Sequence, residues 1–214
     1  MLAVPLLPRH IDVARPGRSE RGIAREMVGS RALWRLWLVF LGTLGISVTV
    51  GAWLVYYLTV EGDEAVAIAG LLSFLIFAVA APARILGGRL DHRGVPRRVL
   101  IGVAPLLAAL GVAALAIEPI IAIALPAAVL MGIGWSLPYA AMFDEAQRVF
   151  PKRPLSAIAF TSTGANGAPI LLIPLIGVLF ASDRAELVWL MLAAIVAIGG
   201  LANAWMPSRE TAAG

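Results

Sequence analysis

The sequence predicts an all-α integral membrane protein of six transmembrane helices. Three observations predict it: the 214 residues are 60% hydrophobic and only 14% charged, the mean hydropathy is +0.90, and the apolar residues form long blocks. Soluble domains carry about 25% charged residues. A soluble core could not bury so much apolar surface in so short a chain. The blocks also lack the strict alternation of barrel strands.

Six blocks are long enough to span a bilayer, which takes about 20 mostly apolar residues. The connections between them are short, so we expect sequential helices to be antiparallel neighbours in one bundle. The blocks cover residues 36–60, 65–86, 99–117, 120–142, 155–180 and 187–206.

The segment before the first block is basic and polar. Ile23, Met27 and Trp34 recur there at roughly helical spacing from Ser19 onward. This pattern favours a helix lying on the cytoplasmic membrane surface, and a disordered arm is the alternative. The predicted divisions are a cytoplasmic arm or linker with an interfacial helix (1–35), a six-helix transmembrane domain (36–206) and a cytoplasmic tail (207–214).

The basic residues predict the orientation. Every one of the 17 Lys and Arg residues except Arg184 falls in the termini or in the second and fourth connections, and acidic residues occupy the other connections. Cytoplasmic loops carry the excess of Lys and Arg, so both termini are predicted to be cytoplasmic in an inner or plasma membrane. Because the arginines lie in short clusters between apolar blocks, the pI near 10.3 does not indicate nucleic acid as a partner.

The composition also limits the chemistry. The chain has no cysteine and only two histidines, which excludes disulfides and thiolate catalysis and argues against a metal site. No nucleophile–base pair or pair of carboxylates falls inside a predicted span. We therefore predict neither an enzyme nor a bound cofactor, and the surrounding partner is the lipid bilayer.

One segment between the second and third blocks has a recognisable pattern. Residues 84–98 read RILGGRLDHRGVPRR, in which a glycine, three residues, an aspartate, basic residues, a second glycine and a basic pair follow in order. This segment resembles the cytoplasmic signature loop of the major facilitator superfamily, although His92 stands where arginine is usual and Pro96 precedes the basic pair. The residues carrying the signature are Gly87, Gly88, Arg89, Asp91, Arg93, Gly94, Arg97 and Arg98.

These residue types have a physical reading of their own. Gly87 and Gly88 would let two helix ends approach, and Asp91 could face the positive end of a neighbouring helix and pair with an arginine. Such a lock favours one conformation and must release during a transport cycle. The alternative is a plain basic loop with a turn at Arg93–Gly94.

The resemblance implies more than the loop. It suggests the C-terminal six-helix half of a transporter, built from two inverted three-helix repeats, with a small solute between two halves. The partner would be a complementary half or a second copy. The opening MLAVPLLP looks like the end of a preceding span, which suggests a truncated or split product. The predicted function is solute transport by alternating access. The alternative is a six-helix membrane protein without transport activity, or a fragment that acts only as an interaction module.

The resemblance also places candidate cavity residues, because the first and fourth helices of each half line the cavity in this family. Asn166, in the fifth block, is added because an unpaired amide in the middle of a span is costly and could bind the substrate. Helix packing or anchoring at the membrane surface is the alternative role for each. No ionisable residue falls in the middle of a span. At the cytoplasmic end of the fourth span, Arg148 could pair with Asp144 or Glu145. The cavity candidates are Thr49, Trp53, Tyr56, Trp135, Ser136, Tyr139 and Asn166.

Overall fold

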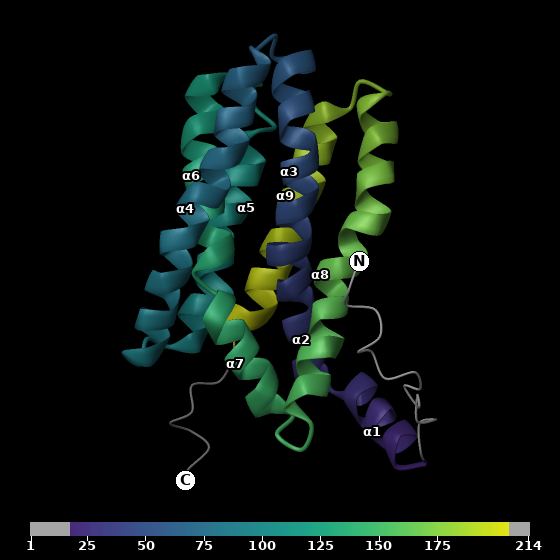
Figure 1. Ribbon diagram of the computed structural model, residues 1–214. Coiled ribbons are helices and arrows are strands. Elements are labelled where there is room, and N and C mark those ends of the chain that lie inside the picture. The colour runs from purple at the N-terminus through teal and green to yellow at the C-terminus, as the bar shows by residue number, and fades with distance from the viewer. Residues whose placement is uncertain (1–17, 206–214) are drawn as a thin grey trace, which may run out of the picture.

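The computed structural model describes residues 18–205, and within that range the long helices run side by side as one bundle (Figure 1). The predictions for the opening apolar stretch, the first part of the arm and the tail at 207–214 lie outside the described residues. No part of the described range forms a strand.

The first long helix is continuous from Arg31 to Glu61 and follows a short helix, α1 (Arg18–Gly29). The Ser30 side chain accepts a hydrogen bond from the Leu33 backbone N–H at 3.4 Å and so caps the long helix. This cap explains why the helix begins at Arg31 and not at the predicted residue 36. Two π-helical segments, which were not predicted, alternate with α-helix in it: α2 (Arg31–Phe40), η2 (Leu41–Gly45), α3 (Ile46–Tyr56) and η3 (Tyr57–Glu61).

The second long helix, α4 (Val66–His92), continues past the predicted end at residue 86. The segment predicted as a loop over 84–98 is therefore mostly helix, and only the chain around Arg93–Pro96 turns. The prediction was wrong here because the apolar pattern stops at the charged residues, whereas the helical backbone continues through them.

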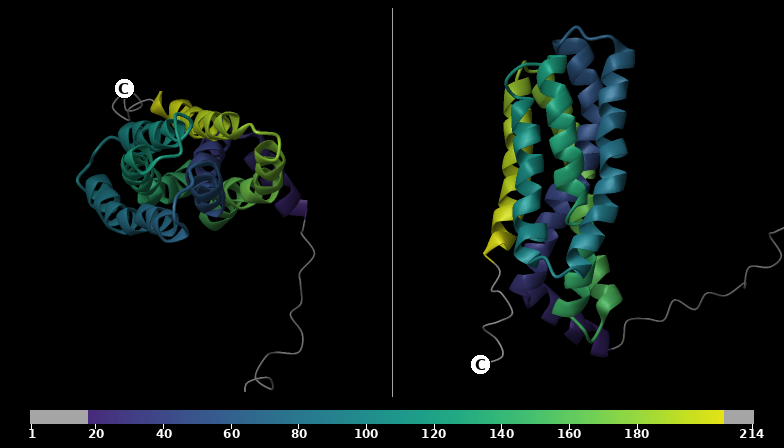
Figure 2. Two further views of the ribbon diagram at one scale, coloured as in Figure 1. Left: turned by 90° about the horizontal axis from the view of Figure 1, so that it is seen from above. Right: turned by 90° about the vertical axis from the view of Figure 1, so that its left-hand side faces the viewer.

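The next helix is shorter. It consists of η4 (Arg98–Val103) and α5 (Ala104–Ala114), and its 17 residues end before the predicted residue 117. Five other helices of the described chain are long and apolar enough to cross a membrane. The short helix lies along its neighbours (Figure 2).

The last two helices match the predicted blocks within two residues, whereas the fourth span continues to Val149, seven residues past the predicted end, and contains one break. Leu137 and Pro138 separate α6 from α7, although the two form one span of 29 residues. Proline lacks the backbone N–H that would continue the helical hydrogen bonds. The elements are α6 (Ile121–Ser136), α7 (Tyr139–Val149), α8 (Pro154–Phe180) and α9 (Ala185–Ala204).

The packing follows only in part the expectation that sequential helices are neighbours: α5 and α6 make the most extensive contact, whereas other major contacts join helices far apart in the sequence. The helix α4 packs mainly on α6, α5 packs on α6 and α9, and α2 with η2 packs on α8 and α9. Glycines allow these close approaches. A Cβ atom on Gly132 would lie 2.6 Å from the Ile76 carbonyl oxygen of α4, and one on Gly134 would lie 2.3 Å from the Ala108 nitrogen of α5.

The two ends of the bundle differ in charge. The turns at one end carry Asp63, Glu118 and Asp183, and we call this the acidic end. The opposite end carries α1, α7 and the basic turns before η4 and α8, and we call it the basic end (Figure 1).

Candidate functional site

The last turns of α4 lie directly against the break between α6 and α7. A Cβ atom added to Gly87 would lie 2.1 Å from the Leu137 carbonyl oxygen, so this position accepts only glycine without a shift of backbone. A Cβ atom on Gly88 would meet only Ala140 Cβ, at an ordinary 3.8 Å. The expected close approach of two helix ends therefore depends on the first glycine and not on the second.

The turn after α4 brings the chain back towards the bundle. Gly94 has φ of +81°, which lies in the left-handed region that favours glycine. Pro96 begins the following helix, because its carbonyl oxygen accepts the backbone N–H of Val99 at 2.8 Å. A proline is well suited to a helix start. Pro96, which departs from the signature, therefore fixes the next residue, Arg97, at the start of η4.

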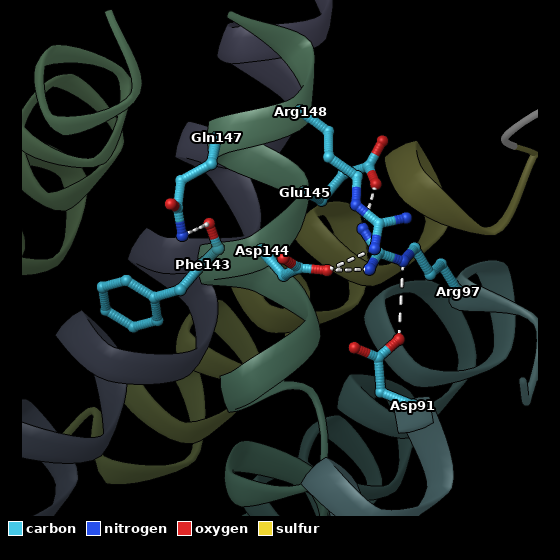
Figure 3. Close-up of polar contacts among 7 residues, drawn as sticks. All are labelled: Asp91, Arg97, Phe143, Asp144, Glu145, Gln147 and Arg148. Carbon is cyan, nitrogen blue, oxygen red and sulfur yellow. Dashed lines mark hydrogen bonds and ion pairs between the residues drawn. The ribbon is translucent and has the colours of Figure 1, made fainter. Parts of the chain in front are cut away.

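Arg97 joins the turn to α4 through one carboxylate and to α7 through two, and we call Arg97 with these three acids the Arg97 cluster (Figure 3). Its Nε lies 3.4 Å from Asp91 Oδ1, and its Nη1 donates to Glu145 Oε2 at 2.5 Å. Its Nη2 donates to Asp144, which also pairs with Arg148 at 2.8 Å. The guanidinium fork thus binds α4, the turn and α7 together.

The environment of Arg97 keeps its charge. Burial lowers the pKa of the Arg97 guanidinium, but its hydrogen bonds to Glu145 and Asp144 and the charge of Asp91 outweigh that effect. The pKa is therefore raised above its ordinary value. Side chains of Arg97, Asp91 and Glu145 are each about one-sixth exposed, so solvent screens these ion pairs less than it would on an open surface.

The other basic residues of the signature lie outside this cluster. Arg89, Arg93 and Arg98 are exposed, as is His92 in the last turn of α4. Arg84, one turn before Gly87, stacks its guanidinium on the Tyr139 ring at 4.3 Å from the ring centroid. This contact joins α4 to α7 a second time.

The first-helix cavity candidates lie towards the acidic end. Thr49 is fully buried, and its hydroxyl donates to the Gly45 carbonyl oxygen within the same helix. Trp53 and Tyr56 are in contact at 5.5 Å between ring centroids, and Tyr56 is 39% exposed. Trp53 Nε1 is buried without a hydrogen-bond partner among the described residues.

The candidates on later helices separate into buried and exposed groups. Trp135 and Ser136 are almost fully buried at the end of α6, and Trp135 Nε1 has no partner in the described part of the chain. Tyr139 is half-buried beneath Arg84. Asn166 is exposed near the middle of α8. The structure thus does not gather the seven candidates into one cavity within this chain.

Some contacts at the basic end were missed by the sequence reasoning. From the sequence, Asp144 and Glu145 were expected to pair with Arg148. The ion pairs of Arg97 with both acids were not predicted. Asn203 was also missed: it is fully buried in α9 and donates to the Arg35 carbonyl oxygen of α2 at 2.9 Å. Its signal in the sequence was an amide close to the end of an apolar block.

The apolar spans and the short connections define a multi-pass membrane protein. The family model of the Major Facilitator Superfamily matches residues 1–156, and the chain belongs to that family. This match confirms the predicted superfamily. The family consists of transporters and not of enzymes, as expected from the residues. The search of curated proteins found no match.

Proposed function

We propose that this chain is one six-helix half of a carrier that moves a small solute by alternating access. The Arg97 cluster is the observation that carries the proposal. It joins the signature turn to α7 at the basic end, and the chain belongs to a transporter family. A cation among three carboxylates is a strong and specific joint, which a plain basic loop does not need.

The packing supports two inverted three-helix repeats. An exchange of the first three spans with the last three maps the first long helix onto α6–α7, α4 onto α8, and η4–α5 onto α9. The contact of the first long helix with α8 then corresponds to the contact of α6 with α4. Likewise, the contact of the first helix with α9 corresponds to that of α6 with α5. Both members of each pair are major contacts in the bundle. Such exchange symmetry is typical of transporters built from inverted repeats.

Six spans and a cytoplasmic basic end complete the proposal. The helix Arg98–Ala114 is about 26 Å long at 1.5 Å per residue, near the lower limit for a span. The basic end would face the cytoplasm of the cell membrane. The basic helix α1, placed before the first span, supports the C-terminal half, because a linker would precede that half.

The cluster has a mechanical role in this proposal. It makes α4, the turn and α7 one rigid unit and holds Asp91 at the basic end, where the other half of the carrier would meet it. That other half is a complementary six-helix chain or a second copy. Tyr56 and Asn166, which are exposed here, would then lie in the cavity between the halves, whereas the buried Thr49 would support the helix.

The experiment is uptake of a panel of small solutes and anions by cells that express this chain with a complementary half. Asp91→Asn should impair uptake and leave membrane insertion intact, because it removes one carboxylate of the cluster. The control is Asp63→Asn, at the acidic end, where φ of +52° suits asparagine as well. Unchanged uptake in Asp91→Asn contradicts the role of the cluster, and folded chains without any uptake favour the interaction-module alternative.

A further inference from the structure

A cation lies within the apolar part of α4, near the basic end of the bundle. Arg84 is about five turns after Val66, the first residue of α4, or about 27 Å along the helix. The hydrocarbon region is about 30 Å thick, which places Arg84 near its inner boundary. Arginines within spans are rare and mark pathways or paired sites. The contacts of this side chain therefore bear on function.

The guanidinium of Arg84 is held on an aromatic ring. It lies 4.3 Å from the centroid of the Tyr139 ring. Tyr139 contacts Phe143 at 4.9 Å between ring centroids, and Phe143 contacts the fully buried Phe40 of α2 at 5.0 Å. These contacts fix the ring on which Arg84 stacks. Within the described range Arg84 forms no ion pair and no hydrogen bond, so the N–H groups in the plane of its guanidinium have no protein partner there.

The carboxylates of the signature segment and of α7 are paired with other cations. All three belong to the Arg97 cluster, and one of them also pairs with Arg148. Residues 84–98 and α7 together carry six arginines and only these three acids. Arg84 is thus without a counter-ion among the described residues, and the excess of positive charge draws anions to this part of the basic end.

The face of α4 that carries Arg84 is otherwise apolar. Phe77 lies two turns earlier on that face and is 49% exposed, and a Cβ atom on Gly51 of α3 would lie 3.4 Å from its ring. Ala81, between Phe77 and Arg84, is exposed as well. The helix α4, the first long helix and α7 all contact one another. Phe77 beside α3 and Arg84 beside α7 therefore lie on the side of the bundle that these elements share.

A carboxylate attached to an apolar body matches this arrangement. A guanidinium binds the two oxygens of a carboxylate through paired N–H donors. The stack on Tyr139 orders the Arg84 side chain before a ligand arrives, which reduces the entropy that binding costs. An apolar body would lie on Ala81 and Phe77, which removes apolar surface from water. A neutral solute would leave the charge of Arg84 without a counter-ion.

We propose that Arg84, held on Tyr139, binds the carboxylate of the carried solute, and that the substrates are small carboxylates with an apolar body. This substrate class rests on the proposed function, because it places Arg84 at the basic-end mouth of the cavity between two halves. Phe77 and Ala81 then favour apolar acids over small polar ones.

Equilibrium dialysis of radiolabelled benzoate against the purified full chain in detergent tests the site without any transport. The wild type should bind benzoate saturably, and benzamide, which has a similar shape without the charge, should compete at least tenfold less well. Arg84→Gln should lower the affinity for benzoate at least tenfold. Arg84→Lys should lower it about fivefold, because lysine keeps the charge and loses the planar fork. The matched control is Arg153→Gln, which removes an exposed cation at the same end and should bind as the wild type does.

Two further variants separate the parts of the site. Tyr139→Leu should weaken benzoate binding about threefold and more than Tyr139→Phe, which keeps a ring under the guanidinium. Phe77→Ala should weaken benzoate more than acetate, which has almost no apolar body to lose contact. Circular dichroism verifies that every variant is folded.

The outcomes distinguish this site from the carrier itself. Absence of saturable benzoate binding, equal binding in Arg84→Gln and wild type, or an equal loss in Arg153→Gln overturns the site. So does displacement of benzoate by one phosphatidylglycerol per chain, because Arg84 would then hold a lipid phosphate. Uptake of neutral solutes alone by the two halves overturns the substrate class and leaves the proposed function intact. Benzoate binding that depends on Arg84, without uptake of any solute, supports the site and contradicts the carrier.

Discussion

Replacing Gly87 by alanine tests how closely α4 must approach the α6–α7 break to hold the Arg97 cluster together. The added methyl group would lie 2.1 Å from the Leu137 carbonyl oxygen, whereas real Cβ contacts are essentially never under 3.0 Å. One of the two helices must therefore move by about 1 Å. The obstacle is backbone, so no side-chain rotation relieves it.

The magnitude follows from two opposing effects. Alanine stabilises a helix by about 1 kcal/mol relative to glycine. Overpacking costs about 1–3 kcal/mol, and a backbone obstacle places the cost in the upper part of that range. The neighbouring Gly88→Ala gains the same helix propensity but makes only an ordinary contact at 3.8 Å. The free energy of unfolding of Gly87→Ala should therefore be about 2–3 kcal/mol below that of Gly88→Ala.

The assay is unfolding of both variants in mixed detergent micelles, followed by circular dichroism. Gly88→Ala should unfold at or slightly above the denaturant concentration needed for the wild type, and Gly87→Ala well below it. Equal stability of the two alanine variants would refute the reasoning, because it would mean that α4 does not approach Leu137 so closely.

Other contacts give predictions of the same kind. Arg97→Gln should lower the free energy of unfolding by about 2–3 kcal/mol, less than for a fully buried pair, and Arg97→Lys should lose less because it keeps the positive charge; equal losses in the two variants would contradict a direct ion pair. Gly94→Ala should cost about 1 kcal/mol because of its positive φ, measured by the same unfolding assay. Asn203→Leu should cost about 1 kcal/mol through the lost interhelical hydrogen bond, and a neutral result would argue against that bond.

The apolar blocks predicted where the helices lie, because burial in a bilayer imposes length and composition directly. The predicted helix boundaries were wrong where something other than burial in the bilayer determines where a helix ends. The helix α4 runs through Arg89 and Asp91, since charged residues outside the hydrocarbon region are compatible with helix. The π-helical segments have no signature in hydropathy. One of them, η2, places Gly45 against Ala168 of α8, and that requirement is visible only in the packing.

The signature segment predicted part of the site. The pairing of Asp91 with an arginine could be anticipated from the charges, and the turn at Gly94 from the glycine. The attachment of Arg97 to Glu145 could not, because the two residues are far apart in the sequence and meet only through the packing of α4 against α6 and α7. For the same reason, the exposed face of α8 at Asn166 follows from the neighbours that the helix acquires and not from its own sequence.

Half of a working carrier should transport solute once it is in a membrane. The most direct measurement is solute accumulation in proteoliposomes that contain the purified chain alone or with a complementary half. We expect accumulation of at least one small solute, and its loss in Asp91→Asn while the variant remains folded and inserted. Folded, inserted chains that accumulate no solute in either arrangement, or that accumulate it equally with Asp91→Asn, would contradict a role as half of a carrier.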